Sequence, residues 1–260
     1  MQVSKVNDIL QRLPGMAGAR VVERLADGPT NASYLVGQGG ERFVLRLDKP
    51  EAERLGLDRA NERTVCEALA TAGLTPAYHW FDSAEGVSLR PFIAGRSLGG
   101  EDLREPRTLQ RLADVLRRLH RLPPVGARFD AAGAVRRYAG QLGTPPAAAL
   151  AERAYGLLAG IERSAVTPAL CHNDLVAENV LETEAGDLLP IDWEYAAIGD
   201  PYFDLAVLVR HHDLNDELAN CLLSAYLQRA SSQEESGRFA LQCSFYEALL
   251  ALWNLRVGGL

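Results

Sequence analysis

The chain has 260 residues, a length that fits one large domain or two smaller lobes. Its 27 basic and 34 acidic residues give a net charge of −7, whereas binding to nucleic acid needs a basic surface. A nucleic-acid partner is therefore not expected, and a cationic or polar small molecule fits the charge better. Only Lys5 and Lys49 are lysines, so the other 25 basic residues (27 − 2) are arginines.

Cysteine spacing and the lack of a long apolar run bear on where the protein works. The cysteines stand singly, without a Cys-x-x-Cys pair, which argues against a zinc site or a disulfide framework. No run approaches the roughly 20 apolar residues of a membrane span. The first ten residues also lack the pattern of a secretion signal. We therefore expect a cytoplasmic protein with no membrane span.

Residues 21–92 predict a small antiparallel sheet with one helix. The runs that predict its strands are 21–25, 33–36, 43–47, 78–81 and 87–92. The turn expected at 27–31 contains residues that tolerate unusual dihedral angles or bind backbone donors. In the third run apolar residues alternate with Arg46, which should therefore project from the face opposite to Leu45 and Leu47.

The helix of this first part is predicted over 58–72, with Gly73 as its C-terminal stop. Its apolar stripe consists of Val65, Cys66, Leu69 and Ala72. Glu62 lies on the same face, three and four residues before the first two members of the stripe. A carboxylate on an inward face needs a partner, and Arg46 is the natural candidate. Such a pair could also serve only to stabilise the lobe.

Beyond a connector at 93–96 the sequence predicts mainly helices. The first begins near Pro106 and has leucines at helical spacing, and His120 at its end is interpreted as complementing the helix dipole. The segment 203–209 is apolar nearly all round, which predicts a buried helix capped by Asp200. The other helices are predicted over 147–161, 217–228 and 238–256, with a polar loop at 231–237. The expected fold class is α+β.

Two polar motifs stand among the apolar segments of the second part. The first is HNDLVAEN at 172–179, and the second is IDWEY at 191–195. The runs 179–182 and 188–192 flank a turn at 183–187, which predicts a hairpin.

The hairpin would bring chemically useful side chains together. Asn179 and Asp192 should be neighbours, because the first residue of one antiparallel strand faces the last residue of the other. An amide oxygen beside a carboxylate suits a magnesium ion that keeps waters and binds phosphates. Asp174, on the loop just before them, would be free to accept a proton from a hydroxyl.

The paired motifs resemble those of the aminoglycoside phosphotransferase and choline kinase superfamily, which is related to the protein kinases. The segment 28–34, GPTNASY, is similar to the phosphate-covering hairpin of choline and thiamine kinases, and the similarity extends from about Val21 to the C-terminus. Arg46 falls where protein kinases have a lysine, and Glu194 replaces the glycine of their metal-binding motif. No P-loop motif is present, which argues against P-loop NTPases.

The resemblance implies a protein-kinase-like fold with two lobes. Residues 1–92 would form a small antiparallel-sheet lobe that binds nucleotide, and residues 93–260 a mainly helical lobe for catalysis and acceptor binding. It also implies a phosphotransferase that uses ATP and Mg²⁺ to phosphorylate a hydroxyl of a small molecule. A choline- or thiamine-type acceptor is expected first, and an aminoglycoside or other sugar second.

The resemblance also assigns roles to residues of this sequence. Asp174 would be the catalytic base, and Asn179 and Asp192 would bind the metal. His172 and Asp204 would support the catalytic loop. The nucleotide-binding residues would be Thr30, Asn31, Ala32, Ser33, Arg46, Glu62 and Phe92. The acceptor-binding residues would be Trp193, Glu194 and Tyr195, although aromatic side chains of this kind also form protein cores.

Two alternatives belong to other functional classes. One is a nucleotide-binding pseudokinase that regulates a partner, although Asp174, Asn179 and Asp192 are all present. The other is a metal-dependent phosphohydrolase, for which His212 and the aspartate after it would add ligands. That hydrolase fold is all-helical, and the strands predicted in the first third of the chain argue against it.

Overall fold

The computed structural model describes residues 3–258, with side chains from residue 6 onward. The chain divides into two compact units, one that ends at Ala94 and one that begins at Gly95. Within residues 3–258, no helix is both long and apolar enough to cross a membrane.

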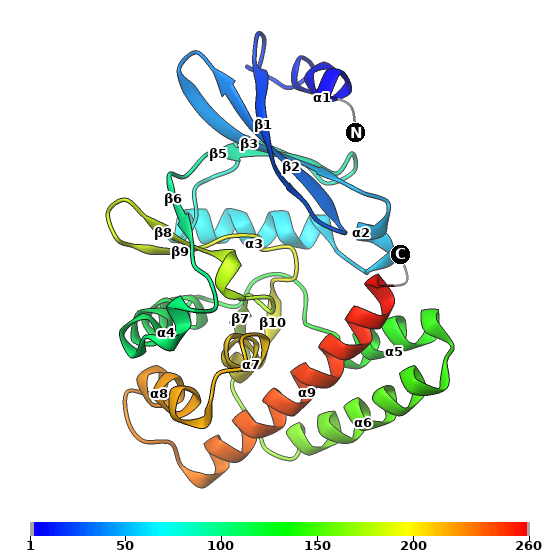
Figure 1. The fold of residues 1–260 in the computed structure, drawn as a ribbon, viewed down its shortest axis with the longest axis vertical. Coiled ribbons are helices and arrows are strands. Elements are labelled where there is room, and N and C mark those ends of the chain that lie inside the picture. The colour runs from blue at the N-terminus through cyan, green and yellow to red at the C-terminus, as the bar shows by residue number, and fades with distance from the viewer. Residues whose placement is uncertain (1–2, 259–260) are drawn as a thin grey trace. The chain divides into compact units, whose positions relative to one another are not determined.

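The first unit is built on a five-stranded antiparallel sheet with the strand order β1-β2-β3-β5-β4 (Figure 1). Its strands are β1 (Arg20–Asp27), β2 (Asn31–Gln38), β3 (Glu41–Asp48), β4 (Trp80–Asp82) and β5 (Val87–Pro91). Its helices are α1 (Val3–Leu10), α2 (Glu51–Arg54) and α3 (Arg59–Thr71). The sheet and α3 were expected from the sequence, whereas α1 and α2 were not.

The two faces of this sheet have different partners. Leu45 and Leu47 on β3 belong to a core cluster that also contains Val6 and Leu10 from the α1 region. Arg46 points to the opposite face, because successive side chains of a strand alternate, and there it meets α3. The alternation predicted for β3 is therefore confirmed, and it separates an apolar face from a face that carries charge.

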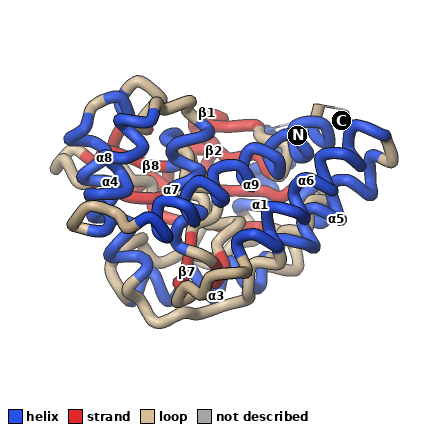
Figure 2. The backbone as a smooth tube through the Cα atoms, turned by 90° about the horizontal axis from the view of Figure 1, so that it is seen from below, coloured by secondary structure: helices blue, strands red, loops and turns tan. Residues whose placement is uncertain are grey.

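The second unit is mainly helical, as the helix colouring of Figure 2 shows. Its helices are α4 (Pro106–His120), α5 (Ala131–Leu142), α6 (Pro145–Ile161), α7 (Pro201–His211), α8 (Asp216–Leu227) and α9 (Gln233–Val257). Its strands are β6 (Gly95–Ser97), β7 (Ala169–Cys171), β8 (Val180–Thr183), β9 (Leu188–Pro190) and β10 (Ala197–Gly199). β6, β8 and β9 form one small antiparallel sheet, and β7 pairs with β10.

Helix α7 is the buried centre of this unit. It packs against α9, α8 and β7, and α9 in turn contacts α5 and α6. The Asp200 carboxylate accepts a hydrogen bond from the Tyr202 backbone N–H, so it caps the helix as predicted. Burial of almost the whole helix places Asp204, a charged residue, in the core of the unit.

Several sequence-based expectations need correction. The polar loop predicted at 231–237 is mostly helix, because Ser232 and Glu235 cap each other's backbone N–H at the start of α9. Helix α5 was not predicted, since glycines at 133 and 140 weaken its helical propensity. The connector predicted at 93–96 contributes to β6. The turn expected at 27–31 is shorter, because its first residue ends β1 and its last begins β2.

Candidate active site

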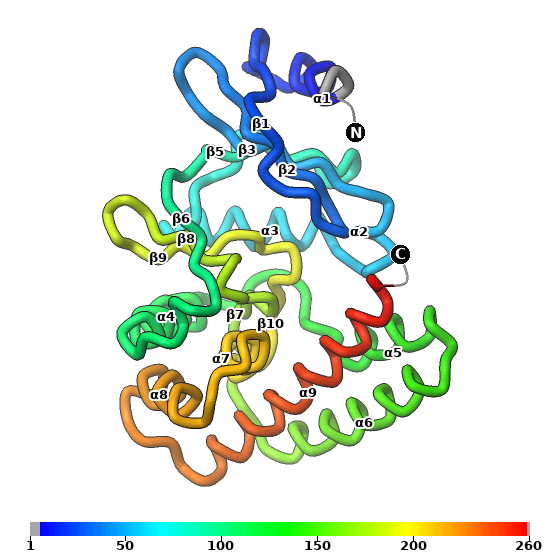
Figure 3. The backbone as a smooth tube through the Cα atoms, in the orientation of Figure 1, coloured from blue at the N-terminus to red at the C-terminus, as the bar shows by residue number. Residues whose placement is uncertain are grey.

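The hairpin predicted around the second polar motif is present as β8 and β9 (Figure 3). Its register differs from the expectation by one residue. The backbone carbonyl of Asn179 accepts a hydrogen bond from the Ile191 N–H at 2.8 Å, so Asn179 faces Ile191 and not Asp192. The reason is that Asn179 ends a 3₁₀ turn, Ala177–Asn179, so the strand begins one residue later. Asp192 lies just past the pairing, in the left-handed region at φ +63°.

Asn179 closes the loop that carries Asp174. Its amide nitrogen donates to the Asp174 backbone carbonyl at 2.9 Å and to the Asp174 carboxylate at 3.2 Å. Both donors of the amide nitrogen are directed at Asp174, so the amide oxygen is the atom that can meet a cation. The structure thus brings the expected catalytic carboxylate and one expected metal ligand into contact.

Asp204 holds the backbone at the start of this catalytic loop. One carboxylate oxygen accepts from the His172 N–H at 2.9 Å, and the other accepts from the Asn173 N–H at 2.7 Å. The His120 Nε2 lies 3.0 Å from the same carboxylate, and the His120 Nδ1 lies 2.9 Å from the Tyr226 hydroxyl. His120 therefore does more than complement a helix dipole, because it joins α4 to the support of the loop.

The same loop is tied to the second motif. The His172 Nε2–H donates to the Ile191 carbonyl at 2.9 Å, and the Asn173 amide donates to the Tyr195 carbonyl at 3.0 Å. Complete burial lowers the pKa of His172, which favours the neutral ring. Trp193 is 2% exposed, and its ring centroid lies 4.5 Å from that of His172. This side chain packs against the support of the loop, and its acceptor role stays a prediction.

The site is strongly negative. Burial raises the pKa of Asp174 well above its ordinary value, and the charges of Asp192, Glu194 and Asp204 raise it further, while the hydrogen bond from Asn179 opposes them. Negative groups held together away from water disfavour one another's ionised forms. A bound cation would relieve this repulsion, so the donor set of carboxylates and an amide fits Mg²⁺.

The charge of Asp174 acts on tyrosines from three places in the fold. Burial raises the pKa of Tyr138 on α5 to about 12, and the charges of Asp174 and Glu194 act in the same direction. Burial also raises the pKa values of Tyr195 and of Tyr246 on α9, and the negative charge of Asp174 raises both pKa values further. Sequence reasoning missed Tyr138 and Tyr246, because each lies on a helix far from either motif and no local pattern marks it.

In the first unit, Arg46 and Glu62 form the expected pair. Their two hydrogen bonds, Nη1 to Oε1 and Nη2 to Oε2, are each 2.7 Å long, and Glu62 is 0% exposed. Arg59 also donates to Glu62, at 2.8 Å, and holds Asp48 through two further bonds of 2.6 and 2.8 Å. Sequence reasoning missed Arg59 and Asp48. The pairing of β2 with β3 places Ser33 opposite Arg46.

The turn before β2 is anchored from the end of β3. Lys49 donates through its backbone N–H to the Thr30 carbonyl at 2.8 Å and through Nζ to the Gly28 carbonyl at 2.5 Å. Thr30 and Asn31 are buried and joined by a hydrogen bond between their side chains, and Ala32 is also buried. The second lysine of the chain thus fixes the shape of the expected phosphate-covering hairpin.

Phe92 follows the last residue of β5. Its backbone N–H donates to the Arg42 carbonyl at 2.9 Å, and the Arg42 guanidinium carbon lies 4.5 Å from the centroid of its ring. The residue is therefore fixed against β3, and its nucleotide role stays a prediction.

Comparison with known proteins identifies the family. Residues 21–240, most of the chain, match the phosphotransferase enzyme family, APH. The chain belongs to this family. The resemblance to this family and the fold that it implies are thereby confirmed. The sheet of the first unit excludes the all-helical fold of the alternative phosphohydrolase.

Relatives of this family member are found among both sequences and solved structures. Protein LicA of Haemophilus influenzae is 29% identical over 218 residues, which are 80% of this chain and 63% of that protein. The chain thus spans less than two thirds of that relative. A choline/ethanolamine kinase family protein from Mesorhizobium loti has a TM-score of 0.81 at 26% identity, covering 98% of this chain and 86% of that one. LicA in complex with AMP has a TM-score of 0.80 at 22% identity, covering 99% and 89%.

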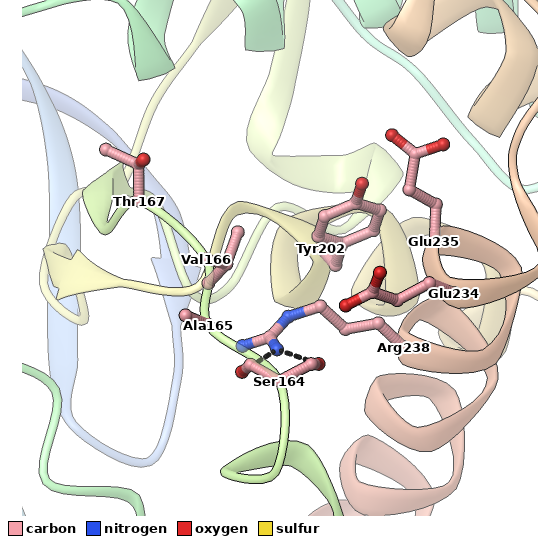
Figure 4. A pocket seen from close by; sticks show the side chains of 8 residues that line it. All are labelled: Ser164, Ala165, Val166, Thr167, Tyr202, Glu234, Glu235 and Arg238. Carbon is pink, nitrogen blue, oxygen red and sulfur yellow. Dashed lines mark hydrogen bonds between the residues drawn. The ribbon is translucent and has the colours of Figure 1, made fainter.

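A pocket of about 300 Å³ in the second unit shares no residue with the motifs (Figure 4). Arg238 lines it, but the guanidinium donates to the Asp200 carboxylate, the Ile161 carbonyl and Ser164. These bonds join α9 to the end of α6 and the start of α7. The hydrogen bonds of Arg238 therefore serve to hold α9 against α6 and α7.

Proposed function

We propose that the chain is a kinase that uses ATP and Mg²⁺ to phosphorylate the hydroxyl of a small cationic molecule of the choline type. The observation that carries the proposal is the hydrogen-bonded pair Asp174 and Asn179, beside the negative charges of Asp192 and Glu194, which raise the pKa of Asp174. Phosphoryl transfer depends on positioning and charge neutralisation, and these residues are of the types that it needs.

The metal would be bound by the Asn179 amide oxygen and the Asp192 carboxylate. Magnesium would neutralise charge on the phosphates of the nucleotide. The negative surroundings of Asp174 support a cation at this place, and the oxygen donors favour a hard ion. Asp174 would orient the acceptor hydroxyl and take its proton. The hydroxyl oxygen then forms the new bond to the γ-phosphorus while the bond to ADP breaks.

The nucleotide phosphates would be bound by residues of the first unit. Arg46 is held in a fixed orientation by Glu62, and its neighbour across the strand pair is Ser33. The anchored turn at Thr30 and Asn31 would supply backbone and side-chain donors, together with Ala32 and Ser33. Phe92 would contact the base. The AMP complex of a structural relative, LicA, is consistent with nucleotide binding in this fold.

The acceptor would lie among the tyrosines of the second unit. The charge of Asp174 raises the pKa values of three tyrosines, Tyr138, Tyr195 and Tyr246, and Glu194 adds a carboxylate. Aromatic faces together with a carboxylate favour a quaternary ammonium group, because ring faces attract cations that are poorly hydrated. This chemistry supports a permanently charged acceptor such as choline or thiamine over ethanolamine or an amino sugar. A cytoplasmic location is part of the same proposal.

An acceptor screen tests this proposal. The protein is incubated with Mg²⁺ and ATP, and phosphorylated product is followed for choline, ethanolamine, thiamine and an aminoglycoside. The expected result is the highest kcat/KM with choline, and Glu194→Gln is expected to raise the KM for choline about tenfold with little change for ATP. Preference for an aminoglycoside would overturn the acceptor class. ATP binding without transfer to any acceptor would support the pseudokinase alternative.

A further inference from the structure

The imidazole of His212, just after α7, contacts the catalytic loop directly. Its Nε2 accepts a hydrogen bond from the Ala177 backbone N–H at 2.9 Å, and the side chain is 7% exposed. Ala177 begins the 3₁₀ turn that ends at Asn179, and the residue before the turn supplies no side-chain cap. The first N–H of such a turn has no partner within it, so His212 satisfies a donor that the loop itself leaves open.

We propose that His212 is a positioning residue for phosphate transfer. As a neutral imidazole it fixes Ala177, and through Ala177 the short loop between Asp174 and Asn179. The side chains of Asp174 and Asn179, which are hydrogen-bonded across this loop, then keep the geometry that the reaction needs. The inference rests on the proposed function, and it adds a residue that lies outside both motifs.

The hydrogen bond requires a specific protonation state of the ring. A nitrogen that accepts from a backbone N–H carries no proton, so the His212 proton is on Nδ1. Protonation of Nε2 would place one donor against another, and the support of the loop would be lost. Activity is therefore expected to fall on the acid side as this ring becomes charged.

The surroundings of His212 favour the neutral ring at pH 7. Burial lowers its pKa, the charge of Glu178 raises it, the neighbouring ring of His211 lowers it, and the charge of Asp213 raises it. The net direction is downward. The Glu178 carboxylate is 3.8 Å from Nε2, and the ring centroids of His211 and His212 are 5.0 Å apart. The His212 ring is therefore expected to become protonated only at a pH below the ordinary histidine pKa of about 6.5.

Two glycines offer a matched pair of variants that leave the imidazole in place. A Cβ atom added at Gly100 would lie 3.2 Å from the Nδ1 of His212, which is tighter than ordinary contact. A Cβ atom added at the neighbouring Gly99 would meet nothing within 4 Å. Gly100→Ala should therefore press on the ring, and Gly99→Ala should not.

The first part of the test measures kinetics of the full chain with ATP, Mg²⁺ and the best acceptor. His212→Ala is expected to lower kcat about tenfold at pH 8, with the KM for ATP nearly unchanged. His212→Gln supplies an uncharged acceptor near the place of Nε2, so it should recover most of this kcat and lose the acid limb of the pH profile. Gly100→Ala should lower kcat a few-fold, and Gly99→Ala should leave it unchanged. Wild-type kcat and pH profile in His212→Ala would overturn the proposal.

The second part does not depend on activity. The NMR signal of the Ala177 amide is followed from pH 8 to 5 in wild type and His212→Gln. The expected result is a shift that follows the titration of His212 in wild type and is absent in the variant. An Ala177 amide signal that does not shift as His212 titrates in wild type would contradict the proposal. If wild type phosphorylates no acceptor, the proposed function fails, and this amide titration decides whether His212 holds the loop.

Discussion

Arg46 and Glu62 join β3 to α3 through two parallel hydrogen bonds of 2.7 Å, with the carboxylate completely buried. A guanidinium and a carboxylate match in this forked geometry, which a lysine cannot reproduce. Arg59 donates to the same carboxylate and extends the pair into a network with Asp48. The network gives the arginine one fixed orientation, which a residue expected to meet phosphates requires.

Removal of this carboxylate should destabilise the protein strongly. Glu62→Gln leaves two arginines without their shared negative partner in a buried place, and a loss of about 3–5 kcal/mol in the free energy of unfolding is expected. Glu67→Gln on the same helix is the matched control, because Glu67 pairs with Arg63 in an exposed position. Its effect should stay within about 0.5 kcal/mol. Urea denaturation of both variants measures the difference, and equal losses would contradict this account.

The contribution of Glu62 should also depend on pH. Burial would raise the pKa of this carboxyl, but Arg46 and Arg59 outweigh burial and hold the pKa below its ordinary value. The folded state therefore favours the charged form. Its stabilisation is present above the unfolded pKa of about 4.3 and is lost as the pH falls through the folded pKa. The gap in unfolding free energy between wild type and Glu62→Gln should shrink below about pH 4, and a constant gap would argue against the assignment.

Replacement of Asp174 should lower the activity and raise the stability of the protein. Asp174→Asn removes the proposed base, so turnover should fall at least about 100-fold while ATP still binds. The same change relieves the repulsion with Asp192 and Glu194, and in metal-free buffer the unfolding free energy should rise by about 1 kcal/mol. Thermal unfolding and a nucleotide-binding titration check the two halves. A variant that is both active and less stable would refute the interpretation.

The proposed metal ligands can be tested by stability alone. An ion that binds only the folded state raises the unfolding temperature with concentration. Mg²⁺ should therefore stabilise wild type, and Asn179→Ala or Asp192→Ala should shift the response to about tenfold higher Mg²⁺. Asp187→Ala, in the turn of the same hairpin, should respond like wild type. Identical Mg²⁺ titrations of all four proteins would remove Asn179 and Asp192 from the metal site.

Local patterns were sufficient to predict much of the fold. Alternation along β3 predicted the projection of Arg46, and helical spacing placed Glu62 on the inward face of α3. The all-round apolar character of α7 predicted its burial, and Asp204 was expected in it. Each of these features depends on residues a few positions apart, so the sequence carries the signal directly.

Other parts of the site depend on tertiary packing and could not be predicted. Tyr138 and Tyr246 come from α5 and α9, and the action of the Asp174 charge on them depends on how those helices pack. The hairpin register was wrong by one residue, because the 3₁₀ turn at Ala177–Asn179 takes a residue from the expected strand. The contact of His212 with Ala177 likewise joins residues 35 positions apart.

The central claim is that this member of the phosphotransferase family transfers phosphate from ATP to a choline-type hydroxyl through Asp174. The most direct measurement is ³¹P NMR of the protein with ATP, Mg²⁺ and choline, beside Asp174→Asn under the same conditions. The account predicts a phosphocholine signal that grows as ADP forms with wild type and is absent with the variant. ADP formation without phosphocholine, or equal product from both proteins, would contradict it.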